Sequence, residues 1–277
     1  MSEERIQKIL AKQGLGSRRE MERAIEEGRV QVNGNTAKLG DKVTDADELR
    51  LDGKPVRQAQ EKVRRVLIYN KPEGEICTRK DPEGRHTVFD RLPKLPGERW
   101  VAIGRLDINT SGLLLFTNDG ELANRLMHPS RQVEREYAVR VLGDVKQEHI
   151  DAMCAGVELE DGSAKFTDIQ YFDGKGSNLW FHVVIMEGRN REVRRLWESQ
   201  GFQVSRLKRV RYGSVFLEST VRAGTWQELP KKEIDRLAAS VELPAMPWKS
   251  IVKSKFDPNK RKMTHQRTRR NVGKVRR

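Results

Sequence analysis

Asp107 is an acidic residue whose neighbours could give it a chemical role. It lies in GRLDINTSGLLLFTNDG, between the short apolar segment VAIGRL and the apolar run GLLLF. Arg105 stands two positions earlier, so both side chains can project from the same strand face. A carboxylate at the end of a strand can act as a nucleophile if it stays ionised, and in a partly buried site this requires a nearby cation. We therefore take Asp107 as a candidate catalytic residue and Arg105 as a candidate substrate-binding residue.

Two simpler interpretations of Asp107 are considered. Asp and Asn commonly close turns through local backbone bonds, and a loop LDINTSG between two strands needs nothing more. Asp107, Asn109, Ser111 and Gly112 also match the first positions of a calcium-binding loop, but Asn118 stands where that loop needs a bidentate Glu. We therefore disfavour calcium and expect no metal site, since the histidines are also scattered without ligand spacing.

The stretch EGRNREVRRLWESQG supplies candidate cations. If Asn190 caps a helix there, Trp197 belongs to its apolar stripe. At about 100° per residue, Arg194 lies nearest to that stripe and is expected to be partly buried. Arg191 and Arg195 are expected to point outward, toward solvent or phosphate. A charged helix face with no role in binding is the alternative.

Residues 1–60 are predicted to form two helices followed by a small sheet. ERIQKILAKQGL has helical apolar spacing, and Ser17 with Glu20 forms a capping box for a second helix. The string RVQV followed by Asn33-Gly34 is typical of a β-hairpin. Cations on the two helices are candidate RNA-binding residues: Lys8, Lys12, Arg18 and Arg19. Arg18 and Arg19 lie at a predicted helix N-terminus, where backbone N–H groups also attract phosphate.

Residues 64–243 are predicted to form an α+β domain with a largely antiparallel mixed sheet and flanking helices. Its predicted strands are RVLIYNKP, WVAIGRL, GLLLFTN, REYAVRVLG, KFTDIQYF, NLWFHVVIMEG and QVSRLKRVRYG, and its predicted helices are GELANRLMHP, KQEHIDAMCAG, NREVRRLWESQG and PKKEIDRLAASV. The polar segment 55–65 is interpreted as a linker. Lys208, Arg209 and Arg211 are predicted to bind phosphates, or else to form a solvated strand edge.

The charge distribution favours a polyanionic partner. The net charge is +14, and the stretch from Lys249 to Arg277 carries six Lys and six Arg against Asp257, which leaves +3 for the rest. Residues 244–277 are therefore expected to form a basic, disordered tail that contacts RNA or DNA. No apolar run approaches the roughly 20 residues of a membrane span, and two cysteines fit a reducing compartment. We expect a cytoplasmic monomer without a membrane partner.

Together these strings resemble bacterial ribosomal RNA pseudouridine synthases of the RsuA/RluB group. GRLDINTSGLLLFTNDG is similar to the catalytic motif of that group, VEREYAVRV and EGRNREVRR are similar to its other two motifs in the same order, and YNKPEG is similar to the opening strand of its catalytic domain. The order helix, GLGSRRE, helix, GRVQVNG resembles the S4 RNA-binding domain. The string EGRNREVRRLWESQGFQVSRLKRVRYG is most similar to the branch that acts on large-subunit ribosomal RNA, and Glu192 stands where many relatives have Gln.

The resemblance implies site-specific isomerisation of uridine to pseudouridine in 23S (large-subunit) ribosomal RNA, without a cofactor. The substrate would be the ribosomal RNA itself or its assembly intermediate. Asp107 would be the nucleophile that attacks a flipped-out uridine, or the base that starts its rearrangement. Tyr137 would stack on the uracil, and Arg194 would pair with the catalytic carboxylate. Arg105 would contact a phosphate or hold the flipped nucleotide.

Two other functions stay open on the residues alone. A non-catalytic RNA-binding protein would need only the S4-like unit and the basic tail. A glycoside or nucleoside hydrolase would need a second carboxylate. Asp119 and Glu121 are the nearest candidates for it, although TNDGE is typical of a turn after a strand.

Overall fold

The N-terminal unit has the predicted two helices and small sheet. In the computed structural model, which describes residues 3–44, 46–56 and 63–251, α1 spans Ile6–Lys12 and α2 spans Arg18–Glu26. The capping box forms, because the Ser17 hydroxyl accepts from the Glu20 amide at 3.1 Å and the Glu20 carboxylate accepts from the Ser17 amide at 2.5 Å. Its strands are β1 (Glu4–Arg5), β2 (Val30–Val32), β3 (Asn35–Thr36), β4 (Lys42–Val43), β5 (Leu49–Leu51) and β6 (Lys54–Pro55). Asn33 and Gly34 take the positive φ values, 49° and 84°, that a type I′ hairpin turn requires.

The remaining described chain is an α+β domain around one nine-stranded sheet with the main order β13-β14-β10-β15-β9-β7-β17. Every pairing in it is antiparallel except β15 with β9, as the prediction of a largely antiparallel mixed sheet requires. Its strands are β7 (Val66–Lys71), β8 (Val101–Ile103), β9 (Ser111–Thr117), β10 (Arg135–Leu142), β13 (Asp168–Lys175), β14 (Asn178–Ile185), β15 (Gln203–Tyr212), β16 (Val215–Phe216) and β17 (Trp226–Glu228). The helices are α3 (Gly120–Met127), a 3₁₀ turn (Pro129–Arg131), α4 (Gln147–Ala155), α5 (Glu192–Glu198) and α6 (Lys231–Ala239), and a separate hairpin joins β11 (Val157–Leu159) to β12 (Gly162–Ala164).

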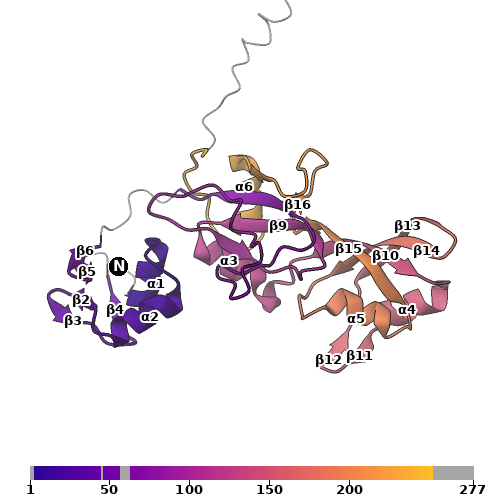
Figure 1. Cartoon of the computed structure of the whole chain (residues 1–277), viewed down its shortest axis with the longest axis horizontal. Coiled ribbons are helices and arrows are strands. Elements are labelled where there is room, and N and C mark those ends of the chain that lie inside the picture. The colour runs from indigo at the N-terminus through magenta and orange to yellow at the C-terminus, as the bar shows by residue number, and fades with distance from the viewer. Residues whose placement is uncertain (1–2, 45, 57–62, 252–277) are drawn as a thin grey trace, which may run out of the picture.

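Helices cover the two faces of this sheet unequally. Strands β7 and β9 are buried on both faces, which explains their unbroken apolar sequences. One face packs with α4 and α5 around Trp197, and the other packs with α3 and α6 around Leu237. Strand β10 alternates between buried and partly exposed residues, so one of its faces lacks such a cover. Figure 1 shows α4 and α5 beside β10, β13, β14 and β15, and α6 beside the β9 region.

The segments that flank the sheet differ in part from expectation. The linker prediction falls largely on residues 57–62, which lie outside the described residues. Residues 244–251 pack against the sheet, because the Arg64 guanidinium donates to the Pro244 carbonyl at 2.7 Å and the Ile251 amide donates to the Glu228 carboxylate at 2.9 Å. The prediction of a disordered tail from residue 244 is therefore wrong for this stretch, and residues 252–277 lie outside the described ranges. None of the described helices is long and apolar enough to span a membrane.

Candidate active site

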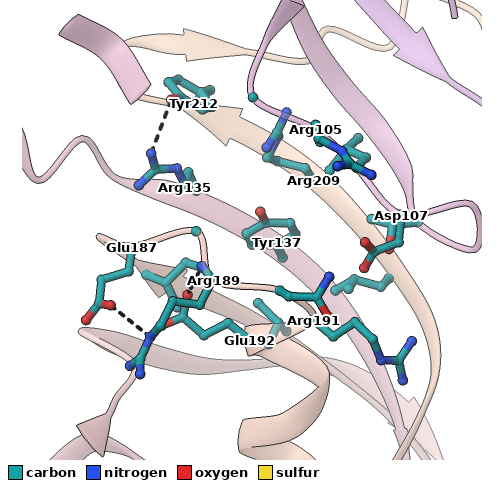
Figure 2. A pocket seen from close by; sticks show the side chains of 18 of the residues that line it. Arg105, Asp107, Arg135, Tyr137, Glu187, Arg189, Arg191, Glu192, Arg209 and Tyr212 are labelled. Carbon is teal, nitrogen blue, oxygen red and sulfur yellow. Dashed lines mark hydrogen bonds and ion pairs between the residues drawn. The ribbon is translucent and has the colours of Figure 1, made fainter. Parts of the chain in front are cut away.

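Asp107 lies in a turn between β8 and β9, at the wall of a cleft of about 680 Å³. The Thr110 amide donates to the Asp107 carbonyl at 3.0 Å, so the backbone closes the turn. No described residue donates a hydrogen bond to the Asp107 carboxylate, which lines the same cleft as Tyr137 (Figure 2). A side chain that only closed a turn would bond to its own loop. The half-buried carboxylate is instead available to a substrate in the cleft.

Lys71, at the end of β7, holds this turn in place. Its side chain is fully buried. The ammonium donates to the carbonyls of Pro72 and Thr110 at 2.9 Å each and approaches the Ile108 carbonyl at 3.4 Å. Burial lowers the pKa of Lys71. We did not identify Lys71 from sequence, although a lysine that closes an otherwise apolar strand is a detectable signal.

Apolar side chains, one of them aromatic, line the cleft together with Asp107. Tyr137 is 7% exposed and lies in the middle of the pocket in Figure 2. Leu106, Ile185, Val193 and Leu207 line the same cleft and are almost fully buried. An aromatic ring among aliphatic side chains can stack on a flipped base while keeping water away from it. The predicted position of Tyr137 in the cleft thus agrees with the structure.

Arg194 is buried as predicted, at 8% exposure, but its contacts differ from those expected. Its guanidinium donates to the carbonyls of Val204 and Asn109, both at 2.9 Å. Among the ion pairs of the described chain, none joins Arg194 to Asp107 within 4.0 Å, so the predicted pair is absent here. Arg194 therefore holds the turn that carries Asp107 by binding the backbone carbonyl of Asn109. Burial is the main cause that lowers the pKa of Arg194, and the nearby Asp107 charge acts in the opposite direction.

The start of α5 corrects the assignment of Asn190 as its cap. Arg191 occupies that position in a left-handed conformation, with φ of 49°. The Arg191 side chain makes no capping hydrogen bond, and the buried Glu192 carboxylate accepts from the Arg189 amide, just before the helix, at 3.0 Å. Burial raises the pKa of Glu192. Arg191 is exposed and lines the cleft, as a phosphate-binding residue would require.

Arg195 has a structural partner that the sequence did not indicate. Its guanidinium donates to both carboxylate oxygens of Asp161, at 2.7 and 2.9 Å. Arg189 also donates to Asp161, so the turn between β11 and β12 is tied to α5. The expectation that Arg195 points freely to solvent or phosphate is therefore wrong.

Cations also gather at the far end of the cleft. The guanidinium groups of Arg135 and Arg209 each lie 5.2 Å from the ring centre of Tyr212. Arg135 donates to the Met186 carbonyl, and Arg209 donates to the Leu113 carbonyl. Arg105 is exposed and lines the same cleft, as Figure 2 shows. Arg135 was not predicted, although period-two alternation in REYAVRV places it on the same strand face as Tyr137.

Lys208 and Arg211 point away from the cleft that Arg209 enters. In a regular strand, Arg209 and Arg211 would face the same side of the sheet. Here Tyr137 pairs with Arg209 and the adjacent Glu136 pairs with Arg211, so Val210 forms a bulge and Arg211 faces the opposite side. Arg211 forms ion pairs of 2.7 Å with Glu134 and Glu136. Lys208 is exposed on the same outer side. These two residues are therefore not part of the cleft that Asp107 and Tyr137 line.

In the N-terminal unit, two of the four predicted RNA-binding cations are engaged by a carboxylate. Lys8 and Lys12 both form ion pairs with Glu4. Arg18 and Arg19 are exposed at the N-terminus of α2, and neither has an ion-pair partner among the described residues. Arg18 and Arg19 are thus the better placed pair for contacting phosphate.

The second carboxylate that a hydrolase would require has a structural role. Asp119 caps α3 by accepting from the Glu121 amide at 2.9 Å, and it pairs with Arg64 at 2.8 Å. Glu121 pairs with Arg125 along the same helix. Within the described ranges, no three His, Cys, Asp or Glu side chains are grouped so that they could hold a metal ion.

Comparisons with known proteins agree with this geometry. A family model described as RNA pseudouridylate synthase matches residues 65–199, and an S4 domain model matches residues 4–49. A Pseudomonas aeruginosa protein named ribosomal large subunit pseudouridine synthase B is 62% identical over 243 residues, which are 87% of this chain and 63% of that protein. A Yersinia pestis protein of the same name is 56% identical over 273 residues, covering 97% of this chain and 85% of the relative.

A solved structure supports the same fold. The crystal structure of a pseudouridylate synthase superimposes with a TM-score of 0.60 at 26% identity, covering 84% of this chain and 99% of that one. Both domain matches, the high identity to the bacterial relatives and the fold point to one family. The chain therefore belongs to the RNA pseudouridylate synthase family of isomerases and carries an S4 domain at its N-terminus.

Proposed function

We propose that this protein converts specific uridines of 23S (large-subunit) ribosomal RNA into pseudouridine, with Asp107 as the nucleophile and the target base flipped out of its stack. The observation that carries the proposal is the unbonded Asp107 carboxylate in a cleft that the buried ring of Tyr137 also lines. The relatives named for large-subunit pseudouridine synthesis support the class of RNA.

The chemistry needs no redox step and no added group. The bond between ribose C1′ and uracil N1 breaks, the uracil turns, and a bond forms between C1′ and C5. The C5 proton leaves to solvent or a base, and N1 gains a proton, so the product is an isomer of uridine. Asp107 either attacks the nucleotide covalently or removes a proton that starts the rearrangement. Tyr137 stacks on the uracil during its turn and keeps it in the cleft.

The cations around the cleft place the RNA. Arg105 and Arg191 are exposed at its wall and suit phosphates next to the flipped nucleotide. Arg18 and Arg19 of the S4 domain suit phosphates farther along the RNA. We place the RNA-binding unit at residues 1–60 and the catalytic unit at residues 64–243, and we propose that the protein acts as a cytoplasmic monomer, which light scattering of the purified chain would test.

The decisive test of the function is the appearance of pseudouridine. Purified protein is incubated with 23S ribosomal RNA from cells that lack it, and pseudouridine is mapped by chemical modification and reverse transcription. New pseudouridine at a defined position, without release of free uracil, is expected. Free uracil would indicate a hydrolase, and RNA that is bound but unchanged would indicate a non-catalytic binding protein.

A further inference from the structure

One half of the large sheet has a face without a helical cover. Strands β13, β14, β10 and β15 pack against α4 and α5 on the side of the active-site cleft. On the opposite side, which we call the outer face, no described helix packs against these four strands, and Figure 1 shows α6 displaced toward β9. Four antiparallel strands with one open face form a platform on which a partner can lie.

Strand register determines which side chains share the outer face. Arg140 of β10 lies between Trp180 of β14 and Arg206 of β15. One row along, Ala138 lies between His182 and Lys208. Adjacent strands are about 4.8 Å apart, so Trp180 and Arg206 are about 10 Å from each other across the face.

Arg211, on the outer face, forms ion pairs with Glu134 and Glu136. Three other cations of this face, on β10 and β15, lack acidic partners among the described residues. Arg206 and Lys208 are exposed, and neither forms an ion pair within the described part of the chain. Arg140 lies 5.9 Å from the ring centre of Trp180 and donates to the Ser205 hydroxyl at 2.8 Å, also without a carboxylate partner among the described residues. Unpaired guanidinium and ammonium groups on a sheet face favour an anionic partner.

Aromatic side chains lie beside these cations. Phe172 on β13 is 69% exposed, and its ring lies 5.1 Å from that of His182. The half-buried Trp180 lies between Phe172 and the cations. Large exposed aromatic side chains on a soluble protein commonly mark a binding surface. The acidic residues of this face are Glu136 on β10, whose carboxylate is bound by His182 and Arg211, and Asp168 and Asp173 on the edge strand β13.

We propose that the outer face binds a single-stranded segment of the substrate RNA, distant from the uridine that is modified. Arg140, Arg206 and Lys208 contact its phosphates, while bases stack on Phe172 and Trp180. The acidic edge on β13 repels phosphate, so the RNA backbone follows β15 and the bases point toward β13. Cations beside exposed aromatic rings on an antiparallel sheet are the pattern that serves single-stranded RNA in general. The inference rests on the proposed function for the identity of the RNA.

Fragments of 23S ribosomal RNA test this proposal: a minimal stem-loop with the target uridine, and the same stem-loop with flanking single strands. The double variant Arg206→Ala with Lys208→Ala is expected to bind the extended fragment more weakly. Its slope of log affinity against log salt should fall by about 1.4, since each lost single-strand phosphate contact removes about 0.7. The matched control, Arg222→Ala with Lys232→Ala, removes two exposed cations elsewhere in the domain.

Phe172→Ala tests the stacking contact separately. Loss of one base stack is expected to weaken binding of the extended fragment by about 5- to 150-fold. The neighbouring Tyr171→Ala is the control, because Tyr171 is 58% exposed but pairs with Phe181 on the other side of the sheet. Ultraviolet crosslinking of the extended fragment should join RNA to the peptide that contains Phe172. Thermal melting of each variant verifies folding.

Unchanged affinity and salt slope in the outer-face variants would overturn the proposal, and so would equal losses in the two controls. Equal losses on the minimal stem-loop and the extended fragment would also contradict it, because they would place the RNA contact at the target site. Wild-type protein that binds the extended fragment through this face but makes no pseudouridine would refute the proposed function and leave this inference standing.

Discussion

Replacing Lys71 by Met should separate the stability of the fold from the position of the turn that carries Asp107. Met has similar length but no ammonium, so the carbonyls of Pro72 and Thr110 lose donors at 2.9 Å. Hydrogen bonds to a charged group contribute roughly 1.5–3 kcal/mol each. Met also avoids the cost of burying an ammonium, which is several kcal/mol. We expect a net loss of unfolding free energy of about 1–3 kcal/mol.

Activity should fall by more than this loss of stability explains. The turn that carries Asp107 loses an anchor, and a displacement of about 1 Å at a reacting group can reduce the rate about 100-fold. Such a decrease corresponds to about 2.7 kcal/mol of activation free energy. Single-turnover release of tritium from RNA with [5-³H]uridine measures the rate, because the C5 hydrogen is lost when pseudouridine forms.

The control for Lys71→Met is Leu237→Ala, on α6. Leu237 is fully buried on the face away from the cleft, and its truncation should cost about 2–5 kcal/mol of stability. At a temperature where both variants are folded, Leu237→Ala should keep the wild-type single-turnover rate. An unchanged rate in Lys71→Met, or an equal decrease in both variants, would refute the assigned role of Lys71.

Three further predictions concern the elements that support the cleft. Gly112→Ala should abolish activity and lower the melting temperature, because its φ is 101° and a Cβ would lie 2.2 Å from the Arg209 carbonyl oxygen; a wild-type melting curve would contradict this. Burial raises the pKa of Glu192, so its ionisation costs stability as pH rises from about 4.5 through the folded pKa. Glu192→Gln should therefore stabilise the protein at pH 7 and lose that gain below about pH 4, as denaturant titrations across pH would measure. Arg195→Ala should lower the stability of the fold through loss of the Asp161 ion pair and leave RNA affinity within about twofold of wild type. A larger loss of RNA affinity would show that Arg195 contacts RNA after all.

Local sequence patterns predicted most of the secondary structure. The capping box of Ser17 and Glu20 and the Asn33-Gly34 turn depend on neighbouring residues, so they are visible in the sequence. Strands β7 and β9 are buried on both faces, and this produces their continuous apolar runs. The short strand β17 was not predicted. It is held by pairing with β7, which is far away in the sequence, so no local pattern indicates it.

The site was predictable where a strand kept its alternation. Tyr137 lies in the cleft as expected, but the bulge at Val210 turns Arg211 to the outer face, and no local pattern indicates that bulge. The Asp161 partner of Arg195 lies on a distant hairpin, so it too was not visible in the sequence. Helical spacing predicted that Arg194 is buried. It could not specify that the guanidinium binds the carbonyls of Val204 and Asn109.

The most direct test of the central claim is pseudouridine formation by Asp107→Asn on a 23S ribosomal RNA fragment. Asn keeps the size of the side chain, and the turn is closed by the backbone of Asp107, so folding should persist. We predict no detectable tritium release or pseudouridine, with RNA affinity within a few-fold of wild type. Conversion at the wild-type rate by Asp107→Asn would contradict the account.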